Sequence, residues 1–165
     1  RAPGPGAAGG PGGGRFFLGP PHPPPGGGSK KRRRLCPAAL GAAGAPNVVA
    51  VCALAPWLDG SDPVGQLAGR TVLIAHGDRD RWTDPAASYA YALRAKAAGG
   101  AVCRFDLPGA GHFMLTRIGD WHALTRRFVL GVTGVEPLDP KIANALAQPA
   151  PRGLNAQLKE MESAR

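Results

Sequence analysis

Three apolar, β-branched stretches constrain the fold of this chain more narrowly than any other feature. They are VVAVCALA directly after Asn47, TVLIAH at residues 71–76 and AVCRFDL at residues 101–107. The first two are apolar almost throughout, which is typical of strands that are covered on both faces, as in a parallel sheet. We therefore predict a parallel strand at each of the three positions.

A helical pattern follows the second stretch. Asp84 is a favourable N-cap with Pro85 at the first helical position, and Gly99 and Gly100 end the element. Apolar residues recur through this segment at helical spacing: Ala86, Tyr89, Ala90, Leu93 and Ala97. This spacing predicts a helix over the segment.

Two more helices are predicted by their caps. Asp120 is expected to cap one of them, and Asp139, followed by Pro140, is expected to cap a shorter one. The longer helix is predicted to bury one face: Trp121, Leu124 and Phe128. Strands that alternate with helices predict an α/β fold, in which a doubly wound, mostly parallel sheet is covered by helices on its faces.

The composition divides the chain. Residues 1–46 are roughly three-quarters Gly, Pro, Ala and Arg, which leaves little apolar surface to bury, so we predict a disordered tail there. We predict a partial α/β domain at 47–148 and a C-terminal tail at 149–165.

The formal net charge of +9 follows the same division. Seven of the twenty basic residues precede position 35, and the first acidic residue is Asp59. Because the basic character belongs to the tail, it is weak evidence that the folded part binds nucleic acid or an anionic membrane. The basic run at 30–34 leaves a nucleic-acid-binding tail as a less favoured alternative.

The three cysteines, Cys36, Cys52 and Cys103, are odd in number, and two of them lie in predicted strands. Free thiols in such runs behave as small hydrophobic groups and are typical of a reducing cytoplasm. No apolar run reaches the length of a signal peptide or the roughly 18 residues of a membrane span. We therefore expect a cytoplasmic protein without a membrane partner.

The candidate catalytic residues follow two of the predicted strands. Asp80 comes three positions after Gly77, and His112 lies in the glycine-rich loop PGAGHF. Because parallel strands end at one edge of a sheet, the two loops are expected to meet there. A carboxylate that accepts the Nδ1–H of an imidazole fixes its tautomer and leaves Nε2 free to act as a base. We therefore predict Asp80 as the acid and His112 as the base, with Asp78 as the rival for the acid.

Other residues near this edge have less specific explanations. His76 and His122 are expected to be structural or solvated histidines. The aromatic residues that flank the edge either line an acyl pocket or belong to the core: Trp57, Trp82 and Phe113.

Residues 47 to about 131 resemble the C-terminal half of an α/β-hydrolase. VVAVCALAPWL is similar to the strand after the nucleophile helix, TVLIAHGDRD to the strand and acidic turn, and PGAGHF to the histidine loop, in the order that this fold uses. The resemblance implies a serine acyl-enzyme mechanism on a small-molecule ester or related acyl compound, with Asp80 and His112 in the triad. It implies no metal or organic cofactor.

The nucleophile elbow of that family, G-x-S-x-G, is absent. Ser29, Ser61 and Ser88 all lack its pattern. Since Gly, Pro, Ala and Arg have codons made wholly of G and C, we interpret residues 1 to about 45 as a frameshifted or mis-assembled replacement of the N-terminal half. The chain alone is then expected to be inactive, and a non-catalytic interaction module is the alternative function. The oligomeric state is left open.

Overall fold

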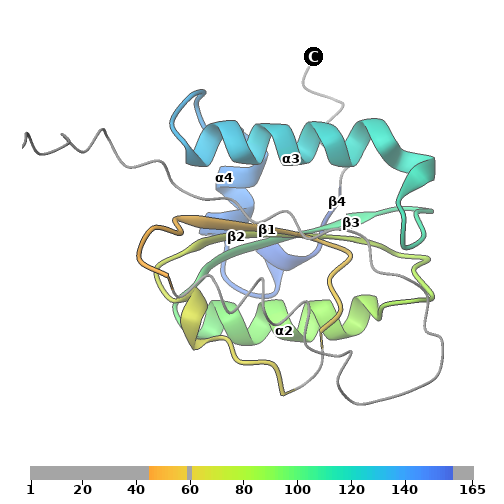
Figure 1. The fold of residues 1–165 in the computed structure, drawn as a ribbon, viewed down its shortest axis with the longest axis horizontal. Coiled ribbons are helices and arrows are strands. Elements are labelled where there is room, and N and C mark those ends of the chain that lie inside the picture. Colours follow the sequence, from red (N-terminus) through yellow and green to blue (C-terminus); the bar gives the residue numbers. More distant parts are fainter. Residues whose placement is uncertain (1–44, 59–60, 158–165) are drawn as a thin grey trace, which may run out of the picture.

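The fold is an α/β arrangement built on a parallel sheet. A computed structural model of the protein describes residues 45–58 and 61–157. Three strands lie in sequence order and carry a two-residue fourth strand at the edge beside β3 (Figure 1). The strands are β1 (Ala50–Leu54), β2 (Thr71–Gly77), β3 (Ala101–Leu107) and β4 (Ala156–Gln157). The predicted strands and their parallel arrangement are confirmed.

The register brings the carboxyl ends of the strands to one edge of the sheet. Thr71 is the partner of both Ala50 and Ala101, so the three strands start in line. Gly77, the last residue of β2, lies opposite Leu107 at the end of β3. The loops after β2 and β3 therefore leave the sheet side by side.

Helices cover both faces of the sheet. Figure 1 shows α2 on one face, and α3 and α4 on the opposite face. The helices are α2 (Pro85–Ala97), α3 (Ile118–Val132) and α4 (Pro140–Ala147), with short 3-10 turns η3 (Gly65–Leu67), η4 (Leu115–Arg117) and η5 (Arg152–Leu154). Within the described residues, no helix combines the length and the apolar character needed to cross a membrane.

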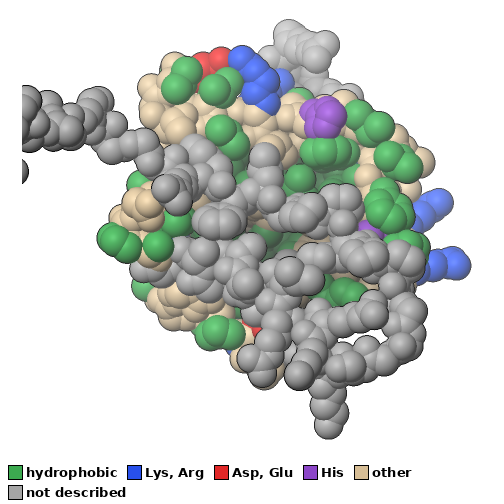
Figure 2. All heavy atoms as spheres, viewed as in Figure 1, with side chains coloured by type: hydrophobic (Ala, Val, Ile, Leu, Met, Phe, Trp, Pro, Cys, Tyr) green, Lys and Arg blue, Asp and Glu red, His purple; other side chains and the backbone are tan. Residues whose placement is uncertain are grey.

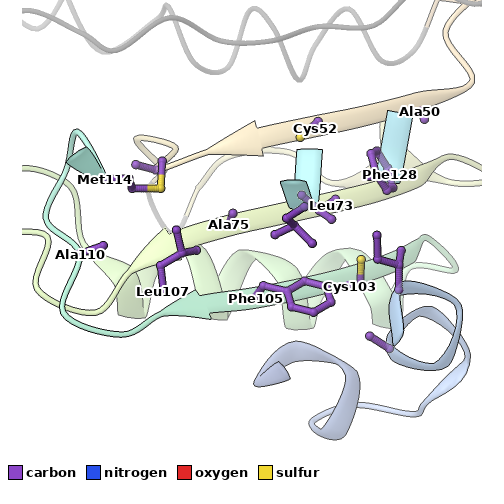
Figure 3. Packing of buried hydrophobic residues seen from close by; sticks show 14 residues of the cluster. Ala50, Cys52, Leu73, Ala75, Cys103, Phe105, Leu107, Ala110, Met114 and Phe128 are labelled. Carbon is purple, nitrogen blue, oxygen red and sulfur yellow. The ribbon is translucent and has the colours of Figure 1, made fainter. Parts of the chain in front are cut away.

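Alternate residues of each strand form two separate cores. Leu73 and Phe105 face α3 and α4 and pack with Phe128 of α3 (Figure 3). Val72 and Ile74 face the other way and belong to the core under α2. The first core also contains both described cysteines, which are free. Burial raises the pKa of the Cys52 thiol to about 12 and also raises that of Cys103. Both thiols therefore stay protonated and serve as small apolar side chains.

Two of the three predicted helix caps are confirmed. The Asp84 carboxylate accepts the amide hydrogen of Ala86, and Asp139 accepts those of Lys141 and Ile142. The cap predicted at Asp120 is wrong, because η4 runs directly into α3 and Asp120 already lies within the first helical turn. Its carboxylate pairs with the side chain of Arg117 instead, with 2.8 Å between Nε and Oδ2.

The helix predicted after Asp84 is confirmed, but the apolar residues that indicated it are only partly in the core: Tyr89 and Leu93 are half-buried against it. Ala86, Ala90 and Ala97 are exposed. The fully buried side chains lie on a neighbouring face: Ser88, Tyr91, Ala92 and Ala95. Alanine occurs all round this helix, so the apolar spacing fits two faces. Tyr91 lies on the buried face, where its ring packs in the core and its hydroxyl donates to the Pro63 carbonyl at 2.9 Å.

The ordered structure continues beyond Gln148, where the sequence carries no clear pattern. Leu154 of η5 is fully buried in the α2 core, and β4 pairs with β3 through Ala156 and Phe105. The proposed N-terminal tail, 1–46, lies outside the described residues except for 45 and 46.

Candidate acid–base site

The site is built where the turn after β2 meets the loop after β3. Backbone hydrogen bonds join the two segments: the Arg79 amide donates to the Ala110 carbonyl at 3.0 Å, and the Asp78 amide donates to the Leu107 carbonyl at 3.3 Å. The Asp78 carboxylate adds a third link, because its Oδ1 accepts the Gly109 amide hydrogen at 2.7 Å. These bonds hold the segments that carry Asp80 and His112 together independently of the contact between the two side chains.

Glycine at position 77 makes this close approach possible. A Cβ at this position would clash with the Ala110 carbonyl oxygen and lie 2.7 Å from its carbon. Ala110 is two residues before His112, so any larger side chain at 77 would push the histidine loop away from the turn that carries Asp80.

We expect Gly77→Ala to lower the free energy of unfolding by about 1–3 kcal/mol, the usual cost of overpacking. Gly119→Ala in α3 is the matched control, because its added Cβ meets no atom within 4 Å. Because Gly119 lies in the first turn of α3, alanine there should raise stability by no more than about 0.5–1 kcal/mol, the gain in a helix interior. Urea unfolding of both variants tests this expectation, and equal effects at the two positions would contradict the close approach.

Asp80 and His112 form a direct, buried pair. Asp80 Oδ2 lies 2.9 Å from His112 Nδ1. An ionised carboxylate only accepts hydrogen bonds, so Nδ1 carries a hydrogen, and in the neutral imidazole Nε2 is then the nitrogen with the lone pair. Among the described residues, Nε2 is buried and has no hydrogen-bond partner. The pair is thus arranged as a base whose accepting nitrogen is free.

Local hydrogen bonds keep Asp80 ionised. Its Oδ1 accepts the amide hydrogens of Trp82 at 2.8 Å and Thr83 at 3.0 Å, and its Oδ2 accepts the Thr83 hydroxyl at 2.6 Å. Burial alone would raise the pKa of this carboxyl, but the bonds from Thr83, Trp82 and His112 outweigh it and lower the pKa to about 2. Asp80 is therefore a carboxylate at neutral pH.

Thr83 was missed in the sequence analysis, although a local signal was present. In an Asx turn, an Asp carboxylate accepts hydrogen bonds from the backbone amides two and three residues later. A Thr or Ser three residues after the Asp can also donate its hydroxyl hydrogen to that carboxylate. The segment Asp80-Arg81-Trp82-Thr83 fits this pattern. Asp78, the rival acid, is exposed and is occupied by the Gly109 amide.

A second imidazole contacts the same carboxylate oxygen. His76 Nε2 lies 3.2 Å from Asp80 Oδ2, and the His76 side chain is completely buried. Burial lowers the pKa of His76 to about 4, although the Asp80 charge opposes this shift. The structure thus places His76 within the site, whereas His122 is exposed on α3.

Ser88, His76 and Asp80 form a hydrogen-bonded series that has the residue types of a catalytic triad. Ser88 Oγ lies 2.9 Å from His76 Nδ1. Ser88 is fully buried, however, and its Oγ also contacts the Pro85 carbonyl at 2.9 Å and Arg104 Nε at 3.2 Å. A carbonyl carbon cannot reach this oxygen, so Ser88 is not placed as a nucleophile.

The buried, neutral His76 is expected to make stability depend on pH. In the unfolded chain His76 binds a proton when the pH falls below its ordinary pKa of 6.5. In the folded protein its pKa is about 4, so it binds the proton only at a lower pH. Stability is therefore fully present above about pH 6.5 and falls by roughly 3 kcal/mol as the pH decreases toward 4. Urea unfolding between pH 7.5 and pH 4 should show this loss, and His76→Gln should lack it. Parallel curves for the two proteins would contradict a neutral His76.

Aromatic rings surround the base. The Trp82 ring stacks on His112 with 5.5 Å between centroids, and Phe113 meets both rings edge-on at 5.0 and 5.2 Å. Trp82 and Phe113 are 40% and 43% exposed, and Trp57 is 39% exposed, so none of the three is a core residue. Figure 2 shows hydrophobic side chains at several places on the viewed face.

Several sequence candidates cannot be placed. Ser29, Cys36 and the basic run at 30–34 lie outside the described residues. Ser61, which is described, is exposed. In the described part of the chain, no three His, Cys, Asp or Glu side chains are grouped so that they could hold a metal ion.

Comparison with known proteins adds no family to this description. No family model matches the chain, and neither the curated proteins nor the solved structures give a match. The class that the fold defines is a small α/β fold with a three-stranded parallel sheet flanked by helices.

Proposed function

We propose that this chain carries the acid and base of an acyl hydrolase that works through a serine acyl-enzyme, with the serine supplied by a nucleophile elbow that this chain lacks. The observation that supports the proposal most directly is the Asp80–His112 pair, 2.9 Å apart, with His112 Nε2 unpartnered among the described residues. The order of the two loops, the acid loop before the histidine loop, is the order of the α/β-hydrolase family that the sequence resembles and also supports the proposal.

The proposed reaction assigns one role to each residue. His112 Nε2 takes the proton of the serine hydroxyl as the oxygen attacks the carbonyl carbon of an ester, and then gives it to the leaving alcohol as the C–O bond breaks. Water deacylates the serine by the same proton transfers. Asp80 holds the Nδ1–H tautomer and stabilises the imidazolium in both halves of the reaction.

The chain alone is expected to hydrolyse a p-nitrophenyl ester no faster than free imidazole does. Neither described serine is placed to use His112, since Ser88 is buried against His76 and Ser61 lacks the elbow pattern. The measurement is initial-rate hydrolysis together with labelling by a fluorophosphonate probe. Fast, stoichiometric labelling of the chain would overturn the assignment, because it would reveal an activated serine within it.

A second experiment joins a serine-bearing elbow segment to this chain. A segment with a strand, G-x-S-x-G and a helix, joined before Asn47, is expected to give turnover and fluorophosphonate labelling. The matched control segment carries alanine at the serine of the elbow. If both joined proteins are equally inactive while they remain folded, the proposed function fails.

A non-catalytic interaction module is the second candidate, because large apolar side chains near His112 are exposed. Leu115 is 69% exposed and Ile118 is 44% exposed, three and six residues after His112 in the sequence, and the Trp82 and Phe113 rings that contact His112 are also exposed. Ester turnover by the joined protein separates this candidate from the hydrolase. Salt-dependent binding to DNA would instead support a role for the basic run at 30–34.

A further inference from the structure

We infer that His76 is a positioning residue for the Asp80–His112 pair: held as a neutral Nε2–H imidazole, it anchors the carboxylate and leaves the carboxylate charge to His112. This inference rests on the proposed function for its catalytic meaning, but its geometry is independent of that function. The contacts fix which ring nitrogen carries the proton, and then why His76 stays neutral.

The tautomer of His76 follows from its two partners. Asp80 is ionised and can only accept, so the Nε2 that lies 3.2 Å from Oδ2 must carry the hydrogen. Nδ1 is then an acceptor, and the Ser88 hydroxyl at 2.9 Å is the group that can donate to it. His76 and His112 are thus opposite tautomers that donate to the same carboxylate oxygen.

Arg104 orients the Ser88 hydroxyl. Its Nε donates to Ser88 Oγ at 3.2 Å, so that oxygen is an acceptor on one side and must direct its own hydrogen elsewhere. The choices are His76 Nδ1 and the Pro85 carbonyl. Giving the hydrogen to Pro85 would leave a buried acceptor on His76 without a donor, whereas the Pro85 carbonyl also accepts from Arg104 Nη2 at 3.3 Å. The hydrogen bonds therefore run in one direction, from Arg104 through Ser88 and His76 to Asp80.

This arrangement keeps a second positive charge off His76. Protonation would need the Nδ1 lone pair, which accepts from Ser88, and it would place a cation near the buried Arg104, which is itself paired with Asp106 at 2.7 Å. When His112 accepts a proton during the proposed reaction, His76 therefore remains neutral. The negative charge of Asp80 then stabilises only the His112 imidazolium.

Thr83 closes the network between the two imidazoles. Its Oγ1 lies 3.2 Å from His76 Nε2 and 3.2 Å from His112 Nδ1, and 2.6 Å from Asp80 Oδ2. With its own hydrogen given to Asp80, it presents lone pairs to both ring N–H groups. Loss of the His76 imidazole therefore removes one of the hydrogen bonds that hold the Asp80 carboxylate in position for His112.

The test is side-chain nitrogen NMR of histidine-labelled full-length chain at pH 7.5, which distinguishes the two neutral tautomers of each ring. We expect His76 to carry its proton on Nε2 and His112 on Nδ1. His76→Phe keeps an aromatic ring but removes the donor, and His112 should then shift to a mixture of both tautomers. His76→Gln, whose amide can donate to Asp80, should retain the Nδ1–H form, and His122→Gln on α3 is the control that should change nothing.

Each contrary result overturns the inference. An Nδ1–H or a doubly protonated His76 at pH 7.5 would show that it does not donate to Asp80 as a neutral ring. An unchanged His112 in a folded His76→Phe variant would show that His76 is structural only. Urea unfolding of both His76 variants checks that they are folded. Because no turnover is measured, failure of the proposed hydrolase activity would leave these signals as they are.

Discussion

Replacing His112 with alanine is expected to lower ester turnover by about 10²–10⁴-fold in the protein that has been joined to a serine-bearing elbow segment. The reason is that Nε2 of His112 has no hydrogen-bond partner among the described residues and can accept a proton, while Nδ1 is held by Asp80. A missing base leaves the serine hydroxyl without a proton acceptor, so kcat falls more than KM rises. Steady-state kinetics with a p-nitrophenyl ester measure both constants.

His122→Ala is the matched control, because this exposed histidine on α3 is not part of the Asp80 network. Its turnover should equal that of the unmodified joined protein. If the joined protein ignores His112→Ala and depends on His122 or His76 for turnover, then the assignment of the base is wrong, even though the fold stands.

The strands and two caps could be predicted because their causes are local. Apolar runs rich in β-branched residues mark β1 and β2 directly, and Asp84 and Asp139 satisfy amides only two or three residues away. The meeting of Asp80 with His112 needed one further step, the rule that parallel strands end at the same edge. The 2.9 Å contact agrees with that step.

The remainder depends on packing that no local pattern contains. The alanines of α2 fit several faces equally, so their spacing alone does not identify the face on which Tyr91 packs in the core. The contact between His76 and Asp80 arises because the turn after β2 folds back by four residues onto the strand end, which brings Nε2 toward Oδ2. The sequence identifies His76 as a strand residue but not as a partner of the acid.

Replacing Asp80 with alanine is expected to lower the free energy of unfolding by about 3–5 kcal/mol, the range seen when one member of a buried charged network is removed. The carboxylate accepts hydrogen bonds from two backbone amides, the Thr83 hydroxyl and both imidazoles. Alanine leaves these buried donors without an acceptor, and water has little access to them. Urea unfolding at pH 7.5 gives the value.

Asp78→Ala is the control for this loss, because it removes another carboxylate from the same turn. The Asp78 carboxylate is exposed and accepts one hydrogen bond, from the Gly109 amide. It should cost about 1 kcal/mol or less. Comparable losses for the two variants would contradict the network around Asp80.

Asp80→Asn separates stability from chemistry: its amide keeps the volume and one acceptor, but the NH₂ group donates where the carboxylate accepted. Facing that donor, His112 is expected to move its proton from Nδ1 to Nε2, so the joined enzyme should lose its base while the protein remains folded.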